Sequence, residues 1–385
     1  MQQVLENTTK SVDCRLCGAP NLVLVLELSS APRSVERLLL SDGLSDDGPC
    51  SLEVYQCRNC GLVQLVRSMA ADFYDDYAMA TSFSPSFHVY LEELADMFCA
   101  TFGAARGRLL EIGCGDGTFL SYLSKQGFDV YGLEPSKPFR DAARGKDLKV
   151  FGSYLGQDSP APDSPYDAFV TRQVLEHVFD ISGFLRGIHM SVSPGAPGLL
   201  EVPNLCKSVT DGRFYDFFPD HVNYFSPQTL RRALEISGFD VIDVVPTMND
   251  EYIAAFVKRS KLTDMLPVRS AVDAIRTSLA QFVEDHRQAG KRLAIWGSGG
   301  KGVAALAAVG WEGVSYVVDT DPRKQGLFMP VHLQVFAPER LKTEHVDTVL
   351  VTALAHLNEI SVQLRKELNF EGRIAVLGTS IDFVY

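Results

Sequence analysis

The sequence lacks any long apolar run, and its basic residues are outnumbered by acidic ones. A membrane-spanning helix needs about 20 consecutive apolar residues, and no stretch of that kind occurs. The first residues also lack the basic segment and apolar core of a secretion signal. The 385 residues include 36 Lys and Arg against 48 Asp and Glu, a formal net charge of −12. We therefore expect a cytoplasmic protein that has neither nucleic acid nor a membrane as its main partner.

The length predicts two or three domains. We place the boundaries of three at residues 1–72, 73–262 and 263–385. The first segment contains paired cysteines, and the second alternates the patterns of buried strands and amphipathic helices. The third opens with a predicted linking helix from Asp264 to about Ala289 and continues with further strands. The pattern is that of an α/β protein.

Cysteine is concentrated near the N-terminus in two Cys-x-x-Cys motifs. Their four thiols belong to Cys14, Cys17, Cys57 and Cys60. Four cysteine ligands are typical of a tetrahedral structural zinc site, which leaves no coordination position open for catalysis. Two reduced cysteine pairs without a metal are the alternative.

The stretch 109–120 organises the central segment. It begins as an apolar run, breaks at Gly113, Gly115 and Gly117, and resumes with a helical pattern, which predicts a strand, a tight turn and a helix. Such a turn brings the backbone close to a ligand. The next predicted strand ends at Glu134, where a carboxylate about 20 residues beyond the turn accepts ribose hydroxyls. A turn that only packs a helix on a strand is the alternative.

Two details distinguish this turn from a dinucleotide-binding one. The glycines are spaced G-x-G-x-G, and an acid, Glu111, precedes them. A carboxylate here opposes a pyrophosphate but suits the ammonium and sulfonium of S-adenosylmethionine (SAM), and the stretch resembles the first motif of class I SAM methyltransferases. The predicted SAM contacts are Glu111, Gly113, Cys114, Gly115, Asp116, Gly117, Phe119, Leu120, Glu134, Pro135 and Gln173.

A histidine follows the last strands of this segment. His221 lies in an aromatic stretch, residues 214–226, directly after Asp220. A core histidine satisfied by the backbone and a general base are both compatible with this pattern. His177 and Asn204 each follow a predicted strand, where the ligand crevice of an α/β sheet opens.

The C-terminal segment contains a second glycine motif. Residues 297–302 follow a predicted strand, read G-x-G-x-x-G, and are trailed by Asp319 at the end of the next strand. An NAD-dependent oxidoreductase would use such a motif, but a Rossmann-like unit without a cofactor is equally compatible. Lys301 and Lys324 are placed to meet a phosphate group.

The order of these motifs resembles the sugar C-methyltransferase family, which acts on nucleotide-activated deoxysugars. The resemblance covers nearly the whole chain and includes the paired cysteines and the stretches 111–117, 220–221, 297–302 and 319–326. It implies a class I SAM methyltransferase (Rossmann-like) core, an N-terminal zinc-binding domain and a C-terminal Rossmann-like α/β domain. In this family the sugar nucleotide binds between the domains.

The resemblance also implies roles for individual residues. His221 would be the base, with Asp220 beside it, and Tyr77 belongs to a segment that resembles a lid. Tyr77 or Tyr224 would stabilise an enolate oxygen, whereas Phe218 stands where the family has a tyrosine. The residues expected to contact the substrate are Arg33, His177, Asn204, Lys301 and Lys324.

We therefore expect a SAM-dependent methyltransferase with structural Zn²⁺ that acts on a dTDP-type deoxysugar, as a monomer or homodimer. For a 4-keto sugar, His221 would remove the acidic proton beside the ketone, and the enolate carbon would attack the SAM methyl group. An O-methyltransferase acting on a sugar or another small molecule is the first alternative. An NAD-dependent oxidoreductase and a binding protein that never turns SAM over are the others.

Overall fold

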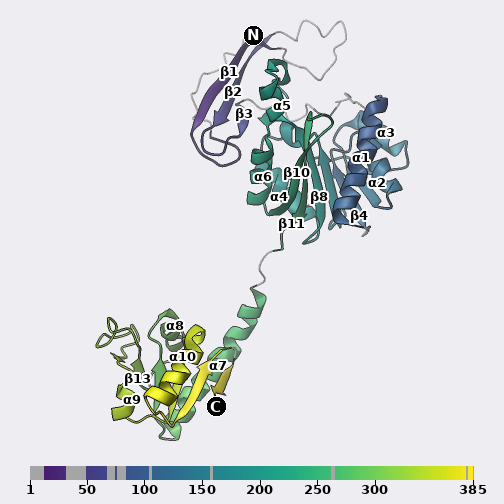
Figure 1. The fold of residues 1–385 in the computed structure, drawn as a ribbon. Coiled ribbons are helices and arrows are strands. Elements are labelled where there is room, and N and C mark those ends of the chain that lie inside the picture. The colour runs from purple at the N-terminus through teal and green to yellow at the C-terminus, as the bar shows by residue number, and fades with distance from the viewer. Residues whose placement is uncertain are drawn as a thin grey trace, which may run out of the picture. The chain divides into compact units, whose positions relative to one another are not determined.

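The chain forms two compact units, Met1–Lys261 and Leu262–Tyr385 (Figure 1). The structure is a computed structural model, and it describes residues 13–31, 49–66, 74–75, 84–103, 106–156, 159–261, 265–378 and 380–384. Within these ranges no helix is both long and apolar enough to cross a membrane. Arg33 and Tyr77, two of the predicted site residues, lie outside the described residues. The separation of residues 1–72 from the central domain stays a prediction.

The first unit is built on a seven-stranded sheet of order β10-β11-β8-β7-β4-β5-β6. Strands β4 to β8 run parallel to one another, whereas β11 pairs antiparallel with both β8 and β10. The chain order reverses at β4, so the crevice of this sheet opens at the carboxyl ends of β4 and its neighbours. The strands are β4 (Arg108–Ile112), β5 (Asp129–Leu133), β6 (Lys149–Phe151), β7 (Ala168–Arg172), β8 (Pro197–Pro203), β10 (Phe239–Thr247) and β11 (Tyr252–Arg259).

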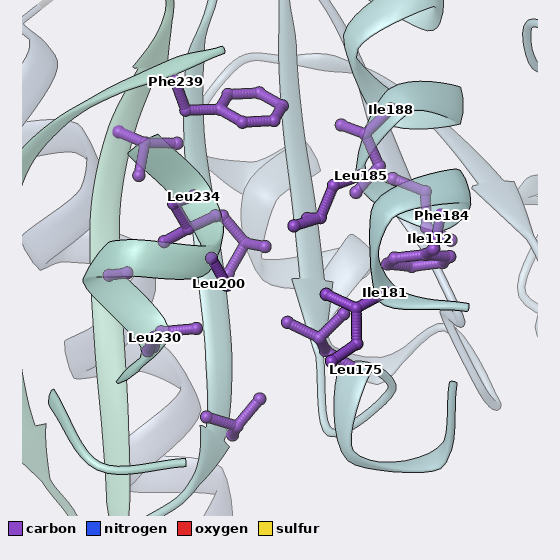
Figure 2. Packing of buried hydrophobic residues seen from close by; sticks show 14 of the residues in the cluster. Ile112, Leu175, Ile181, Phe184, Leu185, Ile188, Leu200, Leu230, Leu234 and Phe239 are labelled. Carbon is purple, nitrogen blue, oxygen red and sulfur yellow. The ribbon is translucent and has the colours of Figure 1, made fainter. Parts of the chain in front are cut away.

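Helices cover both faces of this sheet, because its strands carry apolar side chains on both sides. Neighbouring residues of β8 serve opposite faces: Leu199 packs with α1 and α2, and Leu200 packs with α4 and α6 (Figure 2). Ser226 begins α6 with a capping box to Thr229. The helices are α1 (Pro85–Phe102), α2 (Thr118–Lys125), α3 (Lys137–Arg144), η2 (Leu175–His177), α4 (Ile181–Ser191), α5 (Leu205–Thr210), η3 (Phe214–Asp216) and α6 (Pro227–Ile236).

A second, four-stranded sheet in this unit has the order β1-β2-β3-β9. Three strands come from the cysteine-rich segment, namely β1 (Leu22–Ala31), β2 (Cys50–Cys57) and β3 (Val63–Leu65). The fourth, β9 (Asn223–Tyr224), begins two residues after His221 and pairs antiparallel with β3. The segment that contains the predicted base therefore completes the sheet of the cysteine-rich region, a pairing that the sequence analysis did not foresee.

The second unit contains a six-stranded sheet of order β14-β13-β12-β15-β16-β17, antiparallel only at β17. It opens with the predicted linking helix, α7 (Leu266–Gln288), and the alternation of strand and helix is Rossmann-like. The remaining elements are β12 (Leu293–Trp296), α8 (Gly300–Val309), β13 (Val314–Val318), β14 (Val335–Phe336), α9 (Arg340–Thr343), β15 (Thr348–Val351), η4 (Leu354–His356), α10 (Leu357–Val362), η5 (Gln363–Glu367), β16 (Arg373–Leu377) and β17 (Ile381–Val384).

Truncation of Leu200 tests the packing shown in Figure 2. This side chain is fully buried on β8, so Leu200→Ala should lower the free energy of unfolding by about 2–5 kcal/mol through lost contacts and a cavity. Leu24→Ala is the control, since Leu24 is 44% exposed on β1 and should cost less than about 1 kcal/mol. Amide hydrogen exchange in urea, followed on peptides of the first unit, measures the free energy of unfolding of both variants. Equal losses would contradict the assigned packing.

Candidate active site

A cavity of about 1050 Å³ lies within the first unit. Its wall is formed by the carboxyl ends of β4, β5, β7 and β8, by η2, and by residues around His221. This is the crevice expected where the strand order reverses. Pockets for small molecules usually measure about 300–1,000 Å³, so this cavity lies at the upper end of the range for a ligand site.

The glycine turn after β4 leaves open space on the cavity side. Gly113, Gly115 and Gly117 have φ angles of 72°, 53° and 75°, which glycine adopts without strain. The Gly113 N–H donates to the carbonyl of Leu133 at 2.8 Å, which ties the turn to β5. A Cβ atom added at Gly115 would meet no other atom within 4 Å. The turn therefore admits close approach of a ligand at Gly115.

Glu134 lies at the end of β5 and lines the cavity. Its Oε2 accepts the N–H of Gly115 and its Oε1 accepts that of Ser136, both at 2.8 Å. Burial raises the pKa of Glu134, and the two N–H groups oppose that shift. Each carboxylate oxygen has two lone pairs, so both can still accept a hydroxyl group of a ligand. This geometry suits recognition of the two hydroxyls of a ribose.

Glu111 lies under the glycine turn, and its side chain lines the cavity at 2% exposure. Burial raises the pKa of Glu111 to about 8, although the charge of Arg172 opposes the shift. Its Oε2 has no hydrogen-bond partner among the described residues. A buried carboxylate oxygen without a partner is costly, so the site fits a ligand that brings a positive charge.

Arg172 is a site residue that the sequence analysis missed. Its guanidinium lines the cavity, donates to the Oε1 of Glu201 at 2.7 Å and stacks 4.8 Å from the ring centroid of Phe119. The Tyr90 hydroxyl also donates to Glu201, and the Gln173 side chain donates to it at 3.3 Å. The only signal in the sequence was the position of a cation at the end of a predicted strand.

On the acceptor side, His221 lines the cavity beside two aromatic rings. Its ring centroid lies 4.7 Å from that of His177 and 4.2 Å from that of Phe218. Burial, and then the neighbouring His177, lower the pKa of His221 well below its usual value. The imidazole is therefore neutral at neutral pH and can accept a proton.

The partners of His177 explain how this region is held. Its Nδ1 lies 2.8 Å from the hydroxyl of Tyr74 and 2.9 Å from the backbone carbonyl of Asp220. Glu176 is buried next to it, and ligand atoms of Glu176, His177 and His221 lie within 4.8 Å of one another. The sequence analysis selected neither Tyr74 nor Glu176.

Two predicted catalytic residues occupy positions that differ from the expectation. Asp220 is fully buried and does not line the cavity, and its backbone carbonyl contacts His177. The Tyr224 hydroxyl accepts the N–H of Phe218 at 3.0 Å and donates to its carbonyl at 3.2 Å. Burial raises the pKa of Tyr224. Its hydroxyl thus fixes the loop before His221.

The other predicted SAM contacts, and the predicted substrate contact Asn204, divide into residues that line the cavity and residues that do not. Gly117 and Leu120 do not line the cavity, since Leu120 points into the core between α1 and α2. Asn204 lines the cavity, but its side chain begins α5, accepts the N–H of Cys206 at 3.1 Å and donates to the Asp250 carbonyl at 2.9 Å. The remaining lining residues of the prediction are Gly113, Cys114, Gly115, Asp116, Phe119, Pro135 and Gln173.

Lys301 and Lys324 lie in the second unit, where the second glycine motif begins α8. The Oδ2 of Asp319 accepts the backbone N–H and the hydroxyl of Ser298, at 2.9 and 2.6 Å, and the Nζ of Lys324 at 3.0 Å. Groups of the chain itself thus occupy the carboxylate that would hold the ribose of NAD. This favours a structural role for the motif over the oxidoreductase alternative.

The four cysteines of the Cys-x-x-Cys motifs lie together. The Sγ atoms of Cys14 and Cys60 are 3.4 Å apart, those of Cys17 and Cys57 are 3.7 Å apart, and all four lie within 4.8 Å of one another. Zinc–sulfur bonds of about 2.3 Å in a tetrahedron place sulfur atoms about 3.8 Å apart. The donor set is therefore compatible with zinc.

Comparison with known proteins gives matches along both units. Residues 87–244 match the family described as a methyltransferase domain, and residues 256–377 match the C-methyltransferase C-terminal domain. The C-methyltransferase NovU of Streptomyces niveus is 24% identical over an alignment of 406 positions, gaps included, which covers 97% of each chain. A ubiquinone biosynthesis O-methyltransferase of Sinorhizobium fredii is 26% identical over 46% of this chain and 80% of its own. Magnesium protoporphyrin IX methyltransferase from Synechocystis PCC 6803, a solved structure, covers 45% of this chain and 84% of its own, with TM-score 0.38 and 16% identity.

Removal of Arg172 tests the buried charge network under the cavity. In Arg172→Met the carboxylate of Glu201 loses its cation while it stays buried, so unfolding should become easier by about 3–5 kcal/mol. The double variant Arg172→Met, Glu201→Leu removes both charges and should recover most of that loss. Urea unfolding of the two variants gives the comparison. A single variant as stable as the wild type would contradict the network.

Proposed function

This chain belongs to the sugar C-methyltransferase family, and we propose that it methylates a carbon atom of a nucleotide-activated deoxysugar. It is a SAM-dependent methyltransferase, and the predicted class I methyltransferase core is confirmed by the matched family and the strand order. The observation that carries the proposal is the cavity, in which an unpartnered carboxylate oxygen of Glu111 and the neutral imidazole of His221 line one space.

The cofactor side of the cavity is formed by Glu111, Glu134 and the glycine turn. When bound, SAM supplies an activated methyl group on its sulfonium. The Oε2 of Glu111 would accept a hydrogen bond from the ammonium group of SAM, and this oxygen would then have a partner. Glu134 would accept the ribose hydroxyls, and open space at Gly115 lets the backbone approach the ligand. Residues of the chain thus hold the cofactor without taking part in the chemistry.

His221 is the proposed base. Its neutral imidazole takes the proton from the carbon beside the ketone of a 4-keto sugar, and the electron pair of that C–H bond forms an enolate. The activated methyl group of SAM, when bound, would be the electrophile for the carbon that His221 deprotonates. The Asp220 carbonyl holds His177, and the imidazole of His177 lies against that of His221.

The acceptor assignment is supported by the length of the similarity. Likeness to the C-methyltransferase NovU covers 97% of this chain, whereas likeness to the ubiquinone O-methyltransferase covers 46%. The sequence motifs that resemble sugar C-methyltransferases occur in both units. The alternative acceptor is a hydroxyl oxygen, which His221 would deprotonate in the same position.

We include a structural zinc ion in the proposal, held by Cys14, Cys17, Cys57 and Cys60. The sulfur separations suit a tetrahedral ion, and four thiolates leave no open coordination position. Zinc would therefore stabilise the cysteine-rich segment and take no part in methyl transfer.

The acceptor is tested by mass spectrometry with purified protein, SAM and a panel of 4-keto and reduced dTDP-sugars in deuterated water. A product heavier by one methylene group, with deuterium exchanged beside the ketone, is expected. Methylation of reduced sugars alone would contradict carbon methylation and identify an O-methyltransferase. The absence of methylation of every sugar, despite SAM binding, would overturn the sugar assignment.

The raised pKa of Glu111 predicts that SAM binding depends on pH. With a pKa of about 8 the empty site holds a proton at neutral pH, and a ligand ammonium favours its release. Affinity for SAM should rise with pH up to about 8 and level off above it. Calorimetry in buffers of different ionisation heat measures affinity and proton release. Glu111→Gln should bind SAM more weakly and should not release this proton on binding. Release of the same number of protons by the wild type and by Glu111→Gln would contradict the role of Glu111.

Replacement of His221 should remove proton transfer and leave cofactor binding intact. His221→Asn should slow deuterium exchange beside the ketone by roughly 10²–10⁴-fold, with SAM affinity unchanged. Because burial lowers the pKa of His221, exchange by the wild type should persist below pH 6.5 and fall only when the imidazole gains a proton. His356→Asn is the control, since His356 is exposed in the second unit. Rapid exchange by His221→Asn would eliminate this residue as the base.

A further inference from the structure

We propose that Arg15 is a positioning residue, through which the four-cysteine cluster fixes the location of His221. Arg15 lies between Cys14 and Cys17 in the first Cys-x-x-Cys motif. The inference rests on the proposed role of His221 as base. It adds that the cysteine cluster, although remote from the chemistry, sets the geometry of the catalytic segment.

The guanidinium of Arg15 binds the chain directly after His221. Its Nη1 donates to the carbonyl of Val222 at 2.6 Å and to the Oδ1 of Asn223 at 3.2 Å, and its Nη2 donates to the carbonyl of Leu65. The ring of Phe179 covers the guanidinium, with 4.1 Å between the guanidinium carbon and the ring centroid. One side chain thus ties together β3, β9 and the segment beyond η2.

The backbone of Arg15 is held by the same loop that directs the thiols. The Arg15 N–H donates to the Oε1 of Gln64 at 3.0 Å, and the Gln64 side chain donates back to the Asp13 carbonyl at 3.4 Å. The Gly18 N–H closes the loop on the Cys14 carbonyl at 2.8 Å. A change in the position of the thiols therefore moves the base of the Arg15 side chain.

The catalytic segment, residues 218–225, is joined to the rest of the unit by several further bonds, among them the contact of the Asp220 carbonyl with Nδ1 of His177 at 2.9 Å. The pairing of β9 with β3 involves only Asn223 and Tyr224. Val222 accepts from the Leu65 N–H at 2.9 Å and donates to the Glu176 carbonyl at 2.8 Å. The Asn223 side chain donates to the carbonyl of Val178 at 2.7 Å. These bonds link His221 to η2, so a shift of β9 would alter the spacing of His221 and His177.

The second Cys-x-x-Cys motif shows that its fold does not require a buried arginine. Arg58 occupies the position equivalent to Arg15, directly after the first cysteine of the pair, and its side chain is exposed. Arg15 instead is half-buried. Desolvation of a cation is unfavourable, and the hydrogen bonds of Arg15 to Val222 and Asn223 offset this cost.

The experiment compares the wild type with Arg15→Ala, Arg15→Lys and the matched control Arg58→Ala. Zinc content and SAM affinity are measured first and should not differ. Amide hydrogen exchange of residues 218–225 should accelerate roughly tenfold in Arg15→Ala, less in Arg15→Lys, and not in Arg58→Ala. The rate of deuterium exchange at the sugar should fall roughly 10- to 100-fold in Arg15→Ala, with little change in KM, because a displaced base loses alignment.

Removal of zinc from the wild type by a chelator provides a second test of the coupling. It should accelerate amide exchange of residues 218–225 as Arg15→Ala does, and chelation of Arg15→Ala should add little. Wild-type amide exchange in Arg15→Ala would overturn the proposal, as would an equal effect of Arg58→Ala. The amide readout needs no acceptor, so failure of the sugar assignment leaves it interpretable. Conversely, methylation of the sugar together with unchanged amide exchange in Arg15→Ala would overturn the positioning role of Arg15 and leave the proposed function standing.

Discussion

The cavity of the first unit is built over buried ionisable groups, and their need for partners constrains its structure. Glu111, Glu134 and Glu201 are each at most 6% exposed, and Arg172 is the cation that faces Glu201. Two N–H groups of the chain satisfy Glu134. Glu111 alone keeps an oxygen without a partner, and its raised pKa is the physical response. The protein thus carries an electrostatic imbalance that a positively charged ligand corrects.

The arrangement of sheets separates the residues proposed to bind SAM from the proposed base. The proposed SAM-binding residues lie at the ends of β4 and β5, where the parallel sheet fixes their backbone. His221 belongs to a segment held by β3 and by η2, outside that sheet. Changes in the cysteine-rich segment can therefore affect the acceptor side of the cavity while the cofactor side stays in place.

Local patterns predicted much of this structure, and contacts between distant segments escaped them. The turn after β4, the strand ending at Glu134 and the grouping of the four cysteines follow from spacing that the chain carries locally. Arg172 and Arg15 were missed because nothing near them in sequence indicates their partners. The pairing of β9 with β3 was missed because the two strands are separated in sequence by about the length of a domain. In addition, β9 has only two residues, too few to show a strand pattern.

The place of β9 in its sheet has a consequence for synthesis of the chain. Strand β3 leaves the ribosome long before Asn223 and Tyr224 exist, so one of its sides has no neighbour during that interval. An unpaired strand edge is a template for association with other chains. The sheet of the cysteine-rich segment is therefore complete only after the segment that contains His221 has been synthesised, and until then the short length of β3 limits the open edge to three residues.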